Sequence, residues 1–366
     1  MVQIMKLTKL LRYLTAIFMV GINLWNYAFN DYAWPVVSRD GAYLMVYFVG
    51  NEPHEQTIHM AVSTDGYNFA ALNNNEAVIE QTLGTKCVRD PYILKGKDEN
   101  GKECYYIVAT DMDAMQGWVS NHAIIFWKSY DLVTWEDEYV LDFRTFPGWE
   151  GCNRAWAPQI IYDEEKEMYM VYLALSTWDN PDTYENEDNA QHYYVYTKDF
   201  KNFTEPEYLY GRRSEQVTMP DGWVSNGIQC IDGDIVYNKK DGYYYLYFKH
   251  DETQKIAYVR SKNLTGPYDE EEPVIVSLNY WGVEGSFMYN ITGTDQWMML
   301  MDEYGEGTFF GQMTSDFKNF KRFRRALYSV DHLHPRHGSV TAISDEDYER
   351  LVNYYGVSEI PAKEKD

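Results

Sequence analysis

The stretch that decides the fold is Ser63–Phe69, which reads STDGYNF. It consists of a hydroxyl residue, then Asp or Asn two positions later, and an aromatic residue at its end. Four later copies follow, namely SYDLVTW at 129–135, TKDFKNF at 197–203, SKNLTGPY at 261–268 and TSDFKNF at 314–320. A phrase that returns after roughly 50 to 70 residues indicates one supersecondary unit that is repeated around or along an axis.

Each copy follows runs that are typical of β-strands. Apolar and aromatic residues such as 58–62 precede the phrase directly, and a stronger run such as 43–48 lies before them. A third run lies before four of the stronger ones, at 90–94, 157–162, 232–237 and 284–289. Runs of this kind between Asp, Asn, Gly and Pro predict strands. With the strand after the phrase, each unit has about four strands, and such units in radial repetition form a β-propeller.

The two ends of the chain supply complementary parts of one unit. The first unit lacks an opening strand, and the chain ends with an extra one at 337–343. We infer that this C-terminal strand completes the N-terminal blade, which would hide the sheet edges. The sequence therefore predicts an all-β, five-bladed β-propeller closed by its C-terminal strand. The alternative, an open solenoid, would need capping units that the sequence does not show.

Residues 1–28 differ from the rest of the chain. Three basic residues precede an apolar stretch at 13–24, which is too short to span a bilayer comfortably. This pattern is typical of an export signal. We therefore expect an exported protein, periplasmic or extracellular, with an uncleaved N-terminal anchor as the alternative. Residues 29–366 carry one continuous repeat series and predict a single propeller domain.

The charge and the aromatic content narrow the range of partners. The formal net charge is −24 and no basic patch is visible, so a polyanion such as nucleic acid would be repelled. Aromatic residues make up 17% of the chain, with 34 Tyr and 11 Trp. Rings in such number suit stacked propeller sheets and also suit the binding of sugars.

Alignment of the five opening strands gives candidate residues for a site on the axis. The same register position is assigned to Asp90, Ala157, Asp232, Glu284 and His337. Corresponding strand ends of a propeller converge on one face, so three carboxylates should meet in one cavity. Clustered carboxylates shift one another's pKa. Such a cluster suits glycoside hydrolysis, in which one carboxylate activates water and one carboxyl protonates the leaving oxygen.

The motifs around these residues resemble those of glycoside hydrolase family 43. In chain order they are Val-Arg-Asp-Pro at 88–91, Trp-Ala-Pro at 156–158, Ile-Asp at 231–232, Glu-Gly at 284–285 and Arg-His-Gly at 336–338. The resemblance covers about residues 40 to 345 and implies a five-bladed propeller with arabinofuranosidase, arabinanase, xylosidase or galactanase activity.

The resemblance also implies roles for single residues. Asp90 would be the catalytic base, Asp232 would tune and orient the acid, and Glu284 would be the general acid. His337 resembles an axial histidine that in many members lies near a water or a calcium ion. No organic cofactor is implied, and a structural Ca²⁺ near His337 is left open.

Several residues near the expected axis are candidates for sugar contacts. Trp156 is placed to stack on a sugar, with Arg154 beside it, and Arg336 adjoins His337. Further candidates are Trp118, Trp223 and Trp281, for which blade packing is the alternative. Gln159 departs from the family pattern, which usually has Asp or Glu there, so local charge and hydrogen bonding should differ. Lys249 ends a strong strand and is expected near the rim together with Asp251 and Glu252.

These features lead to one hypothesis and its alternatives. The hypothesis is an exported, inverting glycosidase that releases a pentose, α-L-arabinofuranose, from plant-type polysaccharide or its oligosaccharides. One alternative is a glycosidase of the same fold for another sugar, such as a β-xyloside or a β-galactoside. Another is a non-catalytic glycan-binding propeller, because a fold does not prove an activity.

Overall fold

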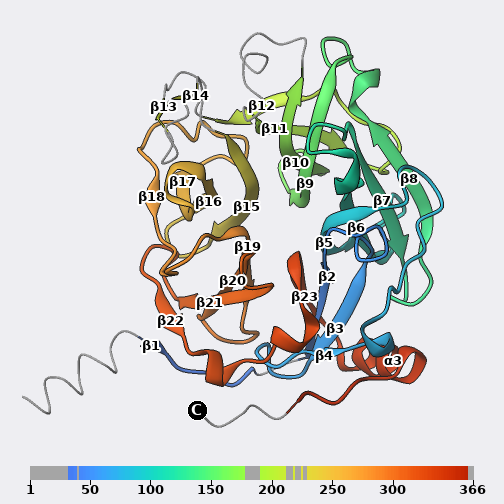
Figure 1. Cartoon of the computed structure of the whole chain (residues 1–366), viewed down its shortest axis with the longest axis vertical. Coiled ribbons are helices and arrows are strands. Elements are labelled where there is room, and N and C mark those ends of the chain that lie inside the picture. The colour runs from blue at the N-terminus through green and yellow to red at the C-terminus, as the bar shows by residue number, and fades with distance from the viewer. Residues whose placement is uncertain are drawn as a thin grey trace, which may run out of the picture.

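Five β-sheets surround a central axis in the computed structural model of the protein (Figure 1). The structure describes residues 32–38, 41–177, 190–211, 217–218, 224–225 and 229–361. Within each blade the four successive strands pair antiparallel, and the innermost strands of the five blades contact one another in a ring. The predicted all-β, five-bladed propeller is confirmed.

The strands are distributed over the blades as follows. Blade 1 contains β23 (Arg336–Ile343), β2 (Ala42–Phe48), β3 (His59–Ser63) and β4 (Ala70–Ala71). Blade 2 contains β5 (Val88–Lys97), β6 (Glu103–Asp111), β7 (Ala123–Ser129) and β8 (Glu136–Asp142). Blade 3 contains β9 (Cys152–Asp163), β10 (Met168–Thr177), β11 (Gln191–Thr197) and β12 (Glu207–Tyr210). Blade 4 contains β15 (Cys230–Asn238), β16 (Tyr243–His250), β17 (Lys255–Ser261) and β18 (Val274–Ile275). Blade 5 contains β19 (Glu284–Asn290), β20 (Trp297–Glu303), β21 (Thr308–Thr314) and β22 (Lys321–Phe323).

A few further elements complete the described chain. The strands β13 (Val217–Thr218) and β14 (Val224–Ser225) pair with each other, and helix α3 (Asp345–Tyr355) follows the last strand. Short 3₁₀ turns lie at Asn73–Asn75, Ala114–Gln116, Phe143–Thr145, Asp251–Thr253, Arg325–Leu327 and Asp331–Leu333.

Both ends of the chain close the ring. The C-terminal strand β23 pairs antiparallel with β2, with Ala42 opposite Ile343 and Val46 opposite Ser339, so the predicted closure is confirmed. A second closure, which the sequence did not predict, is made by β1 (Tyr32–Ala33). This strand pairs in parallel with β22 at the outer edge of blade 5. Joining the first and last blades from both termini protects edges that would otherwise stay open.

The hydrophobic core lies between the blades. One cluster joins Tyr43 and Met45 of blade 1 to Phe287 and Leu300 of blade 5, and similar clusters join the other neighbouring blades. Helix α3 adds Leu351 to the cluster between blades 1 and 2. The alternating residues of each strand thus face two neighbouring blades, which explains why both faces of the middle strands are apolar.

The repeated phrase forms the turn between the third and fourth strands of its blade. In the last copy, Asp316 Oδ1 accepts hydrogen bonds from the backbone N–H of Lys318 at 3.0 Å and of Asn319 at 2.7 Å. The first three copies make the same bonds. The next residue, Phe317, has a φ of 68°, a left-handed conformation that is costly for a bulky side chain. Its ring is buried, so packing offsets that cost.

Replacing Asp316 with Ala should lower the free energy of unfolding by about 1–2 kcal/mol, because the turn loses the acceptor that these N–H groups share. Urea unfolding of the purified protein measures the change. The matched control is Asp269→Ala, at an exposed carboxylate, for which the change should stay within about 0.5 kcal/mol. Equal stability of the two variants would contradict this account of the turn.

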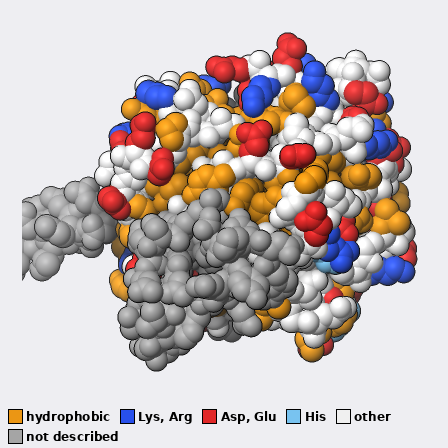
Figure 2. Space-filling model, turned by 90° about the horizontal axis from the view of Figure 1, so that it is seen from above, with side chains coloured by type: hydrophobic (Ala, Val, Ile, Leu, Met, Phe, Trp, Pro, Cys, Tyr) orange, Lys and Arg blue, Asp and Glu red, His pale blue; other side chains and the backbone are white. Residues whose placement is uncertain are grey.

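The surface of the protein carries acidic and basic side chains together. Figure 2 shows one edge of the ring, on which acidic and basic side chains are scattered among apolar ones. The predicted export signal at 1–28 lies outside the described residues, so it stays a prediction. Among the described residues, no helix is long and apolar enough to cross a membrane.

Candidate active site

The inner strand of every blade carries a β-bulge near its first residues. On β5, for example, Arg89 pairs with Thr110 and Tyr92 pairs with Val108, so two residues oppose one. Equivalent shifts occur on β9, β15, β19 and β23. Four of the bulged residues have a positive φ, namely Asp90 (50°), Ala157 (48°), Asp232 (57°) and Gly285 (53°). Bulges of this kind re-aim side chains and are frequent beside active sites.

The bulges correct the predicted register in one blade. Asp90, Ala157, Asp232 and His337 share one position, as expected, but the fifth equivalent is Gly285 rather than Glu284. Glu284 instead aligns with Arg89, which precedes the bulge. The predicted alignment of Glu284 was wrong by one residue, because the sequence alone does not show at which residue the strand pairing shifts. Gly is required at 285, since a Cβ would lie 2.4 Å from the His337 ring.

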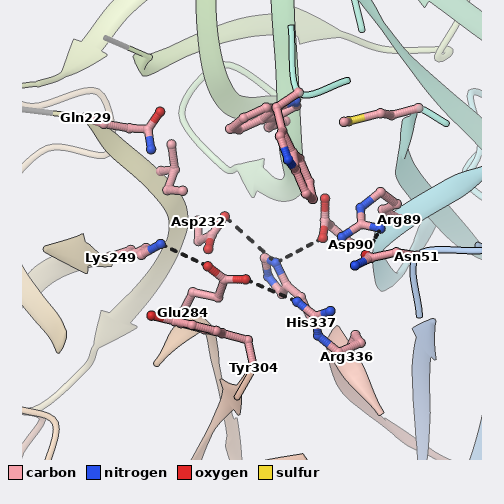
Figure 3. Close-up of a pocket in the computed structure, with 14 residues that line it drawn as sticks. Asn51, Arg89, Asp90, Gln229, Asp232, Lys249, Glu284, Tyr304, Arg336 and His337 are labelled. Carbon is pink, nitrogen blue, oxygen red and sulfur yellow. Dashed lines mark hydrogen bonds and ion pairs between the residues drawn. The ribbon is translucent and has the colours of Figure 1, made fainter. Parts of the chain in front are cut away.

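A cavity of about 410 Å³ opens at this end of the inner strands. Figure 3 shows the side chains that converge on it, which come from all five blades and from the loop that follows β2. Its lining includes eight predicted residues, namely Asp90, Trp118, Trp156, Asp232, Lys249, Glu284, Arg336 and His337. Further lining residues are Asn51, Arg89, Met112, Gln229, Ile231 and Tyr304.

Three predicted sugar contacts, Gln159, Arg154 and the exposed Trp281, lie outside this lining, and Trp223 is not among the described residues. Gln159 is buried and accepts a hydrogen bond from the Tyr172 hydroxyl at 2.7 Å, and Tyr172 in turn accepts the N–H of Ile235 in the next blade. The amide therefore joins blades 3 and 4. The guanidinium of Arg154 is buried, 5.1 Å from the centre of the Trp156 ring. Arg154 thus supports Trp156 from outside the cavity lining.

His337 lies between two of the carboxylates. Its Nδ1 is 3.4 Å from Asp90 Oδ1 and 3.9 Å from Asp232 Oδ1. Burial alone would lower the pKa of His337, but the bond to Asp90 and the negative charges of Asp232 and Asp90 raise that pKa to about 9. The imidazole is therefore a cation at neutral pH and holds the two carboxylates in place.

Asp90 is held in its ionised form. Burial by itself would raise the pKa of Asp90, but His337 and Arg89 hold it below the ordinary value, and Thr110 donates a hydrogen bond to Oδ2 at 2.9 Å. The same Thr110 oxygen accepts the N–H of Ala157 at 2.8 Å, which fixes its orientation. An ionised, fixed carboxylate can accept a proton from a water molecule.

Asp232 and Glu284 are in opposite electrostatic environments. Burial, together with the charges of Glu284 and Asp90, raises the pKa of Asp232 to about 7. Burial would also raise the pKa of Glu284, but Lys249 at 3.0 Å and Arg336 at 3.3 Å hold it below the ordinary value. The charge of Glu284 acts on Asp232 and also on Asp302, so these carboxyls do not titrate independently. At neutral pH the proton of the Asp232–Glu284 pair resides on Asp232 more than on Glu284.

Sequence analysis missed two residues that shape the site. Asp302, on β20, is fully buried and accepts hydrogen bonds from Arg336 Nε at 2.7 Å and from the His337 N–H at 3.1 Å. Arg89 donates to Asn51 at 2.9 Å and lies 4.4 Å from the centre of the Phe48 ring. No sequence signal distinguishes Asp302 from other acidic residues at strand ends, because its role depends on the pairing of β19 with β20.

The surroundings of His337 do not resemble a calcium shell. Ca²⁺ takes six to eight oxygen ligands, whereas the described side chains place a charged imidazole between two carboxylates. Among the described residues, no group of three or more His, Cys, Asp or Glu side chains is arranged to hold a metal ion. A calcium ion near His337 stays a prediction that the described residues do not favour.

A family comparison decides what kind of protein carries this site. The model of a family related to glycoside hydrolase family 43, described as "Probable glycosyl hydrolase domain", matches residues 40–349. The chain belongs to this family. The match includes all five blades and the whole cavity, so the resemblance seen in the motifs is confirmed and the chain is a glycoside hydrolase of the family 43-related type.

Individual relatives of this family 43-related domain agree with its fold. An α-L-arabinofuranosidase of Bifidobacterium longum is 25% identical over an alignment of 268 residues. The alignment covers 65% of this chain but only 23% of that protein. An exo-1,5-α-L-arabinanase from a bovine ruminal metagenomic library is 22% identical, with a TM-score of 0.50 over 74% of this chain and 87% of that one. A Bifidobacterium bifidum protein named for exo-β-1,3-galactanase is 10% identical, with a TM-score of 0.53 over 80% and 92%. At these identities the two structures show the fold alone.

The stability of this family 43-related domain should fall as the pH rises from about 6.5 to about 9. The folded-state pKa of His337 is raised to about 9 from an ordinary value of 6.5. Its stabilising charge is therefore fully present below 6.5 and is lost as pH rises through 9. Ionisation of Asp232, whose pKa is raised from 3.8 to about 7, lowers the stability over the adjoining range, as pH rises from about 4 to about 7. Melting temperatures between pH 6 and 9.5 test this, and a flat profile would contradict the charged-imidazole assignment.

Proposed function

We propose that the chain is an exported, inverting glycosidase that releases a pentose, α-L-arabinofuranose, from plant-type polysaccharide or its oligosaccharides. The observation that carries the chemistry is one cavity with two kinds of carboxyl group. Asp90 is held ionised by His337, and the Asp232–Glu284 pair retains a proton up to about neutral pH. Carboxyl groups whose environments separate their pKa values are the hallmark of acid and base roles.

The proposed reaction uses each carboxyl once. Asp90 takes a proton from a water molecule while the water oxygen forms the new bond to the anomeric carbon. The glycosidic C–O bond breaks at the same time, and Glu284 gives the proton of the Asp232–Glu284 pair, once that proton resides on it, to the leaving oxygen. Exchange with solvent then removes the proton from Asp90 and returns one to the Asp232–Glu284 pair. Attack of water from the opposite face inverts the anomeric configuration.

The remaining parts of the cavity support binding of one sugar. Trp156 and Trp118 lie edge to face with their ring centres 6.3 Å apart, which offers an aromatic wall on one side. Arg336 is fixed by Asp302 and can donate to a sugar hydroxyl. A volume of about 410 Å³ lies in the range of small-molecule sites and suits binding of one sugar in an exo-type pocket.

The sugar, the compartment and the partner are each proposed on a separate ground. Arabinofuranose is proposed because the curated relative is named for it, although this chain spans only 23% of that protein. Export is proposed from the charged head and apolar stretch in residues 1–28. The expected partner is a carbohydrate, and the acidic composition speaks against nucleic acid. No organic cofactor enters the proposed reaction.

Hydrolysis of a panel of nitrophenyl glycosides tests the proposal. The panel contains the α-L-arabinofuranoside, the β-D-xyloside and the β-D-galactoside, followed by arabinan and branched oligosaccharides. Preferential release of arabinose would support the proposed sugar. An inverted anomer of the first product, followed by NMR, would support the inverting mechanism. A retained anomer would refute the mechanism, and preference for another glycoside would replace the sugar. Binding of oligosaccharides without any turnover would indicate a glycan-binding propeller instead.

A further inference from the structure

One wall of the cavity is made of residues that the proposed reaction does not use. This wall lies beside Glu284 and consists of Lys249, Gln229 and Tyr304, with Asp251 behind them. Figure 3 shows Lys249, Gln229 and Tyr304 on the side of Glu284 that faces away from Arg89 and Asn51. Since Glu284 is the proposed acid, the group that it protonates must approach from its own neighbourhood.

Both oxygens of Glu284 are engaged by cations. Oε2 accepts a hydrogen bond from Lys249 at 3.0 Å, and Oε1 accepts one from Arg336 at 3.3 Å. Each carboxylate oxygen retains a second lone pair, but a cation at each oxygen disfavours a proton on Glu284. Withdrawal of one of the two cations would therefore favour the protonated form, in which Glu284 can act as an acid.

Lys249 is the cation that can withdraw. Arg336 is fixed by a second, shorter contact to the fully buried Asp302 at 2.7 Å. Lys249 has an alternative partner on its other side, Asp251, at 3.4 Å. A flexible ammonium that already lies between two carboxylates can leave one for the other at little cost, whereas a planar guanidinium in a buried pair cannot.

The neighbours of Lys249 offer groups that would bind a sugar. Gln229 donates from Nε2 to Asp251 at 3.2 Å, and its buried Oε1 has no hydrogen-bond partner among the described residues. A buried acceptor without a partner is costly and indicates a missing donor such as a hydroxyl. The half-exposed Tyr304 ring lies 5.5 Å from Lys249 Nζ, and its hydroxyl donates to Gln254 at 2.6 Å.

We propose that Lys249, Gln229 and Tyr304 form the subsite for the leaving sugar, and that Lys249 passes its hydrogen bond from Glu284 to a hydroxyl of that sugar. The proposal rests on the proposed glycosidase function and assigns the leaving-group side of the same cavity. Binding of the correct leaving sugar would free Glu284 Oε2, so that the proton of the Asp232–Glu284 pair can reside there and be transferred to the leaving oxygen.

The direction of the pH effect follows from the groups that face Glu284. On the described elements packed against it these are Lys249, Asp251, Asp232, Arg336, His337, Asp302, Tyr304, Asp90 and Arg89. A general acid is active only while protonated, so activity is lost as pH rises through its pKa. Lys249 lowers the pKa of both Glu284 and Asp232. Removing its charge should therefore move the alkaline limb of the activity profile to higher pH.

The test compares two leaving groups in wild type and Lys249→Met. One substrate is an arabino-oligosaccharide, whose sugar leaving group needs protonation, and the other is nitrophenyl α-L-arabinofuranoside, whose leaving group needs little. In wild type, kcat/KM should favour the oligosaccharide. In Lys249→Met, the ratio of the two kcat/KM values should fall about tenfold or more, and the alkaline limb measured with the oligosaccharide should move upward.

Controls separate this role from a structural one. Lys240→Met replaces an exposed lysine of blade 4 that pairs with Asp295. It should change neither the ratio of the two kcat/KM values nor the alkaline limb of the activity profile. Gln229→Ala, which keeps every charge, should lower the ratio without moving the limb. The subsite proposal alone would be overturned by the following result. The wild-type enzyme is active, Lys249→Met changes neither the ratio of the two kcat/KM values nor the alkaline limb, and Gln229→Ala does not change the ratio. Wild-type protein that hydrolyses neither substrate nor any other glycoside would instead overturn the proposed function.

Discussion

Replacing Asp90 with Asn should lower kcat by about 10²–10⁴-fold, because the amide cannot accept a proton from the attacking water. The substitution keeps the shape of the side chain and leaves acceptor oxygen for His337, which lies 3.4 Å from Asp90 Oδ1. KM should therefore change much less than kcat. Initial rates on the best glycoside of the panel, measured with both substrate and pH varied, check this expectation.

Two outcomes would contradict the role of Asp90. Retention of more than about a tenth of the wild-type kcat would exclude it as the base. A large rise in KM with unchanged kcat would make it a binding residue instead. The matched control is Asp295→Asn, at a surface carboxylate whose contact is to the exposed Lys240, and its kinetics should equal those of wild type.

Replacing Glu284 with Gln should have the second large effect, again about 10²–10⁴-fold on kcat for a sugar leaving group. A nitrophenyl glycoside should lose much less, since its leaving group departs with little help from an acid. Gln keeps a carbonyl oxygen for Lys249 or Arg336, so binding of oligosaccharide should largely persist. Titration calorimetry and steady-state kinetics on both substrates test the two halves of this expectation.

The pH profile adds an independent check on Glu284. In wild type the alkaline limb should reflect the Asp232–Glu284 pair, and the pKa of Asp232 is raised to about 7 by burial and by the neighbouring carboxylates. Activity should fall as pH rises through that region, since the shared proton is then lost. Glu284→Gln has no acid to deprotonate, so its residual activity should lack this limb. An unchanged limb in the variant would assign the proton donor elsewhere.

The sequence located most of the cavity but not its internal arrangement. Asp90, Asp232, Trp156, Arg336 and His337 were placed near the axis because they open inner strands, and a strand is visible from its local pattern. Glu284 was also placed in the cavity, although its register was wrong by one residue. A bulge is set by which partner residue is skipped, so a single strand considered alone does not reveal it.

Residues that reach the site from other strands were harder to predict. Lys249, expected only near the rim, and Asp302, not expected at all, lie on second strands, opposite Ile231 and Glu284. They reach the site only because their strands pair in a particular register: Lys249 lines the cavity, and Asp302 holds Arg336 and His337 from behind. Gln159 shows the converse, since its position in a catalytic-type motif suggested a sugar contact but its amide bonds to Tyr172 between two blades. Both cases depend on contacts between residues far apart in the chain.

The sequence by itself determined the number of blades, the closure by the C-terminal strand and the set of axial carboxylates. These are properties of repetition and of local strand patterns, which survive in the linear order of residues. Only the tertiary structure decided that His337 is charged beside Asp90 and Asp232, and that the surroundings raise the pKa of Asp232 while they lower that of Glu284. Protonation depends on burial and on charges a few ångströms away, and those distances exist only after the blades have closed around the axis.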